Sequence, residues 1–160
     1  MAEFFAEYKT IIVFLHVISA VVWVGGMIAM RFAAHYSFME IESPQKRLER
    51  TAHALKNLFT IVTPFVIILL ITAILMVKGY ALSASSFAPQ AYAKEGIWSF
   101  MALNLFAMIL RRNKAVKLLE AGDTLKAKNA LGLIGKYMVP LNIILGIIAI
   151  YLGASLSGTL

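Results

Sequence analysis

Four long stretches of the chain contain no Asp, Glu, Lys or Arg, and they constrain the fold more than any other feature. They cover residues 11–30, 57–77, 96–110 and 137–160. A helix that crosses the hydrocarbon core of a membrane needs ~20 mostly apolar residues, and the first, second and fourth stretches reach that length. The third is shorter, so the basic residues that flank it, Lys94, Arg111 and Arg112, must snorkel to the interface.

The overall composition agrees with membrane burial. Hydrophobic residues make up 61% of the 160 residues, and a soluble domain of this size needs far more polar surface. We therefore predict an all-α integral membrane protein with a single four-helix transmembrane domain over residues 1–160. The expected helices cover roughly 8–41, 44–79, 89–121 and 124–157.

Two short segments predict tight turns between long helices. Ser43 followed by Pro44 is typical of an N-cap with proline at the first helical position. Gly122 followed by Asp123 is typical of a C′ glycine and a new N-cap. The helices beside these turns are longer than a membrane requires, so we expect their ends to project past the bilayer into the cytoplasm.

The basic residues are concentrated in two connections, although the net charge of +7 belongs to the whole chain. These connections carry Lys46, Arg47 and Arg50 after the first span, and Arg111, Arg112, Lys114, Lys117, Lys126, Lys128 and Lys136 after the third. Cytoplasmic loops of membrane proteins carry an excess of Lys and Arg. We expect a multi-pass protein of a bacterial-type inner (cytoplasmic) membrane, with both termini outside. Charge segregated by loop does not indicate a nucleic-acid partner.

The turns also predict which residues share a depth in the membrane. In an antiparallel hairpin, residues equidistant from the turn lie at similar depth, because each residue rises ~1.5 Å. Asn104 and Asn142 are then opposite each other, and we expect a hydrogen bond between them. The residues expected at the depth of His16 are Thr72, 94–98 and 149–151.

His16 is the one titratable side chain deep inside the first apolar stretch. It either forms a hydrogen bond in a packed bundle or binds a ligand. Ionisable groups inside a membrane are costly and usually functional, and histidine is a frequent axial ligand of haem iron. Trp23 and Met27 share its helix face. The chain has no cysteine, which excludes disulfides, thiolate metal sites and iron–sulfur clusters.

Other candidate residues lie nearer the predicted inner boundary. His35 and His53 are either solvated on the projecting helices or form a second haem or metal site, too far from His16 to include it. Met27 and Met30 have the spacing of a Cu(I) pair, but methionine in apolar helices usually serves packing. Arg31 is either an anchor at the boundary or a clamp for a carboxylate.

The segment "LHVISAVVWVGGMIAMRFAAHY" resembles the opening helix of the HemJ-type protoporphyrinogen oxidases and the related CopD-like membrane proteins. "RLERTAHALKNLFTIVTPFVIILLITA", "LLEAGD" and "MVPLNIILGIIAIYLG" resemble later parts of the same family. The matching positions are Leu15-His16, Trp23, Arg31, Thr63-Pro64, Lys94 and Val139-Pro140. Tyr137-Met138 stands where the family usually has Asn-Glu before the Val-Pro.

The resemblance implies a b-type haem with His16 as its metal ligand. It implies Lys94 as second ligand or catalytic proton group, with Trp23 and Arg31 completing the cofactor-binding set. The implied reaction is the six-electron oxidation of protoporphyrinogen IX to protoporphyrin IX. The CopD-like relatives imply the alternative, a non-enzymatic protein with copper in place of haem. Expected partners are membrane lipid and a porphyrinogen or other membrane-soluble substrate, with a homo-oligomer left open.

Overall fold

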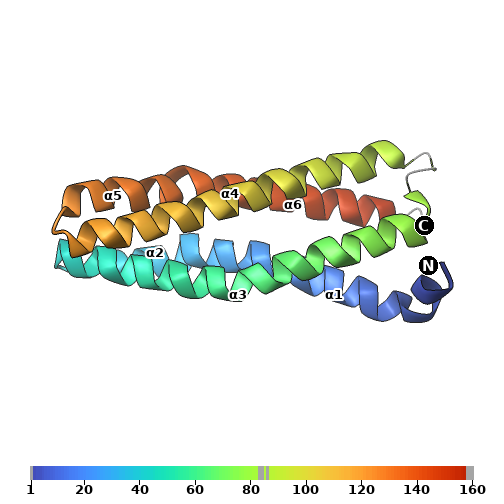
Figure 1. Ribbon diagram of the computed structural model, residues 1–160, viewed down its shortest axis with the longest axis horizontal. Helices are drawn as coiled ribbons and strands as arrows, with labels where there is room; N and C mark the ends of the chain where they lie inside the picture. Colours follow the sequence, from blue (N-terminus) through green and yellow to red (C-terminus); the bar gives the residue numbers. More distant parts are fainter. Residues whose placement is uncertain (1, 83–84, 86, 158–160) are drawn as a thin grey trace.

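The structure, a computed structural model, describes residues 2–82, 85 and 87–157, and all regular structure in these ranges is helical. Four long helical rods run antiparallel side by side (Figure 1). The predicted all-α four-helix bundle is confirmed. All four rods are long and apolar enough to cross a membrane, as in a multi-pass membrane protein.

Two of the rods are single helices, and the other two are each interrupted by one π-helical segment. In chain order the elements are α1 (Ala2–Ala29), η1 (Met30–Ala34), α2 (His35–Met39), α3 (Pro44–Gly79), α4 (Ala88–Glu120), α5 (Thr124–Leu133), η3 (Ile134–Met138) and α6 (Val139–Ser157). π-Helical segments widen the helix and leave its hydrogen-bond register shifted by one residue. The segment η3 ends two residues before Pro140, which has no N–H to continue the ladder.

The first rod begins at Ala2, earlier than the expected residue 8. The reason is a contact that apolar periodicity does not reveal. Phe5 is buried, its ring lies 4.9 Å from that of Tyr80, and it fills the space where a side chain on Gly79 would stand. The end of α3 therefore holds the first turns of α1 in helical form.

Both predicted tight turns are present at the same end of the bundle. The Ser43 hydroxyl accepts a hydrogen bond from the Lys46 N–H, and the Asp123 carboxylate accepts one from the Lys126 N–H at 3.0 Å. Gly122 adopts a φ of +79°, which glycine reaches without strain. These turns join the two rods of each hairpin. The beginning of α1 and the end of α6 lie at the opposite end of the bundle (Figure 1).

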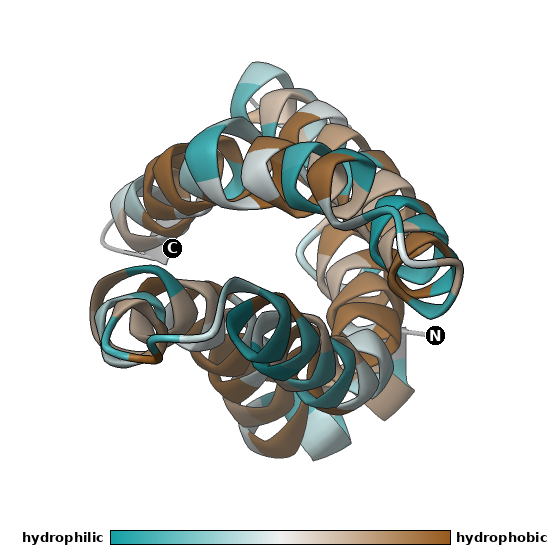
Figure 2. Ribbon diagram, turned by 90° about the vertical axis from the view of Figure 1, so that its left-hand side faces the viewer, coloured by the Kyte–Doolittle hydropathy of each residue, from teal (hydrophilic) through white to brown (hydrophobic). Residues whose placement is uncertain are grey.

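The rods pack as a closed ring. α1 lies against α3 and α6, and α4 lies against the same two helices. The core is apolar and includes the fully buried side chains of Trp23, Met27, Val62, Met108 and Ile134. The outer surface is apolar too, with exposed isoleucine, leucine and phenylalanine along α1, α3, α4 and α6. Hydrophilic residues are frequent at the turn end, which faces the viewer in Figure 2.

Candidate functional site

A polar contact joins the first two long helices deep inside the apolar region. His16 of α1 and Thr72 of α3 approach to 3.0 Å between the imidazole Nδ1 and the hydroxyl Oγ1. Thr72 is buried, and His16 is partly buried. The depth rule predicted that Thr72 lies at the level of His16, which this contact confirms; it did not predict the contact itself.

The hydroxyl of Thr72 decides how the imidazole of His16 is protonated. Thr72 has one O–H, and its Oγ1 lies 2.8 Å from the Ile68 carbonyl and 3.1 Å from the Leu69 carbonyl, to which it donates. When the hydroxyl donates to one of these carbonyls, its oxygen can only accept from Nδ1 of His16, and Nδ1 then carries the ring hydrogen. In a neutral imidazole this leaves the lone pair on Nε2, the arrangement that a metal-binding histidine requires.

Lys94 enters the bundle from the opposite hairpin. It lies on α4 with its side chain partly buried, and its Nζ is so close to Gly153 of α6 that a Cβ there would meet it at 3.0 Å. Because a charge in hydrocarbon is costly, the sequence predicts that Lys94 faces the bundle interior on the side of the His16 helix. Its side chain is partly buried and lies against α6, while its neighbour Glu95 is exposed.

Two indole N–H groups are buried without a hydrogen-bond partner among the described residues. They belong to Trp23, which is 1% exposed, and to Trp98, one helical turn beyond Lys94 on α4. A buried donor left unpaired costs roughly 1–3 kcal/mol. Trp98 was expected only at the depth of His16, and the unpaired indole marks it as a candidate donor to a ligand. Tyr151, expected at the same depth, is 72% exposed and faces outward.

The structure does not bring Arg31 to this cluster. Arg31 lies in η1, roughly 22 Å further along the rod than His16 at ~1.5 Å per residue. Its guanidinium carbon lies 5.8 Å from the ring centre of Phe32. The role of Arg31 as a propionate clamp or an anchor stays a prediction.

The two other histidines lie nearer the turn end. His35 is partly buried with its ring 5.9 Å from that of Tyr36, whereas His53 is exposed. Within residues 2–82, 85 and 87–157, no group of three or more His, Asp or Glu side chains is placed to hold a metal ion. A second site at His35 and His53 stays a prediction.

A second polar pair joins the helices of the other hairpin. Asn104 donates from Nδ2 to Oδ1 of Asn142 at 2.8 Å and to the Met138 carbonyl at 2.9 Å. Asn142 is fully buried and donates from its own Nδ2 to the Met101 carbonyl at 3.1 Å. The predicted bond between the two asparagines is confirmed, and every polar atom of the Asn142 side chain has a partner.

The donor set around His16 fits a haem better than a bare metal ion. A haem iron already has four nitrogen ligands and needs only one or two from the protein, and Nε2 of His16 and Nζ of Lys94 are available. The Thr72 hydroxyl supplies the hydrogen bond that orients a ligating imidazole. A copper ion would need further donors.

The fold and this cluster define a multi-pass helical membrane protein with a histidine–threonine contact between its first two long helices. No family model, curated protein or solved structure matches the chain. The resemblance to the HemJ-type oxidases and CopD-like proteins therefore stays a prediction.

Proposed function

We propose that this chain is a haem-binding redox protein of a bacterial-type inner membrane, with the oxidation of protoporphyrinogen IX to protoporphyrin IX as its candidate reaction. One observation carries the proposal: Nδ1 of His16 lies 3.0 Å from Oγ1 of Thr72, while the other ring nitrogen, Nε2, has no recorded partner in the described part of the chain. Inside a membrane such a group is usually functional.

In this proposal His16 binds the iron of a b-type haem through Nε2. The hydrogen bond to Thr72 fixes the ring plane and raises the basicity of the ligand. The haem supplies an acceptor for electrons from the substrate. The surrounding helices are apolar and would keep water away from the haem.

Lys94 is either the second ligand or the group that accepts protons from the porphyrinogen. It lies on α4 of the other hairpin, with Nζ against Gly153 of α6 and at the depth expected for His16, so a molecule held between the hairpins could contact both. The indole N–H of Trp98 is available to donate to such a molecule. Arg31 could bind a carboxylate of the bound molecule only if that carboxylate extends from His16 toward the turn end of the bundle.

The first test is the visible spectrum of the purified protein and of three histidine variants. The wild type should show a Soret band that shifts on reduction, and His16→Ala should abolish it. His35→Ala and His53→Ala are controls that should keep the spectrum. An unchanged Soret band in His16→Ala would refute ligation. A colourless wild type with stoichiometric copper would favour the CopD-like alternative.

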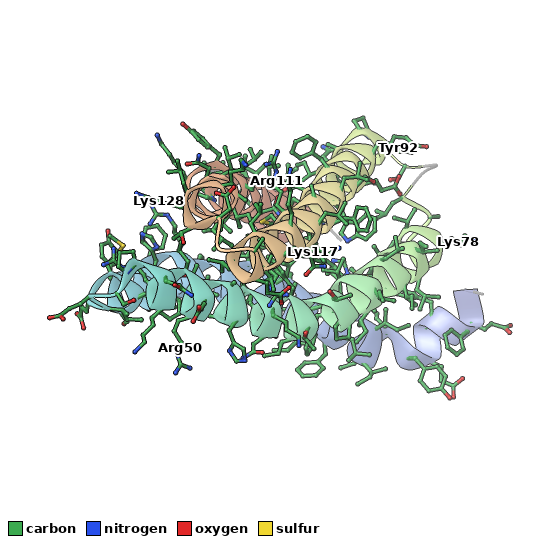
Figure 3. The ribbon with its side chains drawn as sticks, turned by 60° about the vertical axis from the view of Figure 1, so that its left-hand side comes forward. Arg50, Lys78, Tyr92, Arg111, Lys117 and Lys128 are labelled. Carbon is green, nitrogen blue, oxygen red and sulfur yellow. The ribbon has the colours of Figure 1, made fainter. Side chains whose placement is uncertain are left out.

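The second test separates a chemical role of Lys94 from an interfacial anchor. Lys94→Met removes the amine but keeps side-chain length and helix propensity. The haem spectrum or the rate of porphyrinogen oxidation should change, while membrane insertion persists. Lys78→Met, at the same end of the bundle (Figure 3), is the matched control. Wild-type behaviour of Lys94→Met in both assays would remove the chemical support for the oxidase.

The orientation has its own test, because both ends of the chain lie opposite the basic tight turns. A reporter fused after residue 160 should indicate the periplasm. A cytoplasmic signal there would reverse the proposed orientation.

A further inference from the structure

A groove runs between α3 and α4 on the half of the bundle nearer the tight turns. Its volume is about 360 Å³. One end carries polar side chains, namely Lys56, Arg112 and Asn113. The rest of the wall is largely apolar and includes Phe59, Pro64 and Ile109. The groove is therefore amphipathic along its length.

The polarity of the groove follows the expected membrane boundary. Lys56 directly precedes the uncharged stretch 57–77, and Arg112 closely follows the uncharged stretch 96–110. Phe59 and Ile109 lie about one helical turn inside those limits. The polar end thus lies at the membrane surface, and the apolar end extends into the hydrocarbon.

The guanidinium of Arg112 is held in a fixed position at the polar end. Its Nε donates to the Ala52 carbonyl of α3 at 2.9 Å, and its Nη1 donates to Oδ1 of Asn113 at 3.1 Å. This places a charge across the joint between two helices. An ordered guanidinium loses little side-chain entropy when it binds a phosphate.

More basic side chains adjoin the same position. A second groove of about 650 Å³ shares Arg112 and Asn113 and adds Lys114 and Lys117, with Glu120 as its one acid. In the described part of the chain the recorded ion pair is Asp123 with Lys126, in the turn. The cations of the two grooves are therefore available to an anion from outside the chain.

We propose that the groove between α3 and α4 binds one anionic phospholipid from the leaflet on the turn side. Lys56 and Arg112 hold the phosphate, and Lys117 adds to the field around the headgroup. One acyl chain lies along Phe59, Ile109 and Pro64. A zwitterionic headgroup brings its own cation into a basic site, and a free phosphate makes no use of the apolar wall, so an anionic lipid fits both ends.

The test measures binding of phosphatidylglycerol and phosphatidylcholine to the full chain in detergent by native mass spectrometry. The variant Lys56→Gln/Lys117→Gln removes two groove cations that make no recorded contact within the protein. It should weaken phosphatidylglycerol binding about thirtyfold, since each basic residue near a headgroup contributes about 1 kcal/mol. Phosphatidylcholine should bind weakly to both proteins.

The matched control is Arg50→Gln/Lys128→Gln. This variant removes the same number of charges at the same end of the bundle. Both side chains are exposed and point away from the bundle (Figure 3). The variant should leave binding within about twofold of the wild type, because both side chains are exposed to salt solution and neither lines a groove. Equal weakening in both double variants would overturn the proposal, since it would show general charge attraction.

The apolar wall is tested by Thr60→Trp, which fills the groove at an exposed position without changing the charge. It should also weaken phosphatidylglycerol binding, about tenfold or more. Unchanged binding would show that no acyl chain occupies the groove. Full competition by inorganic phosphate alone would identify a free-anion site and would overturn the lipid assignment.

Discussion

The two hairpins of the bundle each contain one polar side-chain pair within the apolar region, and the two pairs differ in what they leave open. In the second hairpin, Asn104 and Asn142 bind each other and two backbone carbonyls, so the buried amide of Asn142 has all its partners. In the first hairpin, Thr72 occupies Nδ1 of His16 and leaves Nε2 unused. We call the asparagine pair closed, because both polar atoms of the buried Asn142 amide are bonded, and the His16–Thr72 pair open, because Nε2 has no recorded partner among the described residues.

The difference separates a polar group that holds helices together from one prepared for a ligand. A polar atom without a partner in hydrocarbon costs several kcal/mol, so a closed pair stabilises the bundle directly. In an open pair, one polar atom has a hydrogen-bond partner or ligand only if a molecule from outside the chain supplies it. The buried side-chain atoms without a recorded partner among the described residues are the indole nitrogens of Trp23 and Trp98 and Oε1 of Gln90. Trp98 and Gln90 lie on α4 with Lys94, and Trp23 is on the helix face of His16.

Of the predictions that compare the two pairs, the largest effect is expected on haem affinity, from substitution of Thr72 in the open pair. Thr72→Val keeps the shape of the side chain but removes the acceptor for Nδ1 of His16. Loss of such an orienting partner typically costs 10–100-fold in affinity, and haem titration of the apoprotein measures it. Thr51→Val is the control, because Thr51 makes the same bond to the carbonyl four residues earlier on α3. Equal haem affinity in Thr72→Val and wild type would contradict the oriented-ligand account.

A smaller effect is expected in the closed pair, and it should appear in stability alone. A double-mutant cycle with Asn104→Leu and Asn142→Leu should give a coupling free energy of about 0.6 kcal/mol, and at most ~1.7 kcal/mol. Unfolding in increasing sodium dodecyl sulfate, followed by helicity, measures it. The Soret band should be unchanged in all three variants. A lost Soret band in a variant that is still folded would show that the second hairpin also contributes to the haem site.

The smallest effect concerns the caps of the two turns. Hydrogen bonds from Lys126 and its charge hold the pKa of Asp123 below the usual 3.8. The cap is therefore intact above about pH 4 and is lost as pH falls through the lowered value, whereas the Ser43 hydroxyl does not titrate. At low pH the protection of the amide against exchange, relative to its intrinsic rate, should fall at Lys126 but not at Lys46. An equal loss of protection at both amides would indicate general acid unfolding.

The sequence by itself determined the number of helices, their turns and the depth of the polar residues. Uncharged length predicts spans, because charge is costly in hydrocarbon. Ser43 and Gly122 locate the turns, and a constant rise per residue then pairs His16 with Thr72 and Asn104 with Asn142. These quantities depend only on position along the chain.

Only the tertiary structure decided which way each helix faces. A soluble helix shows its buried side by an apolar stripe, but a helix in lipid is apolar on every side. Depth alone could not show that Tyr151 points outward while Lys94 points inward. The same lack of a stripe hid the unpaired indole of Trp98 and the groove between α3 and α4. Rotation about the helix axis is set by packing between helices, and that packing exists only once the bundle has formed.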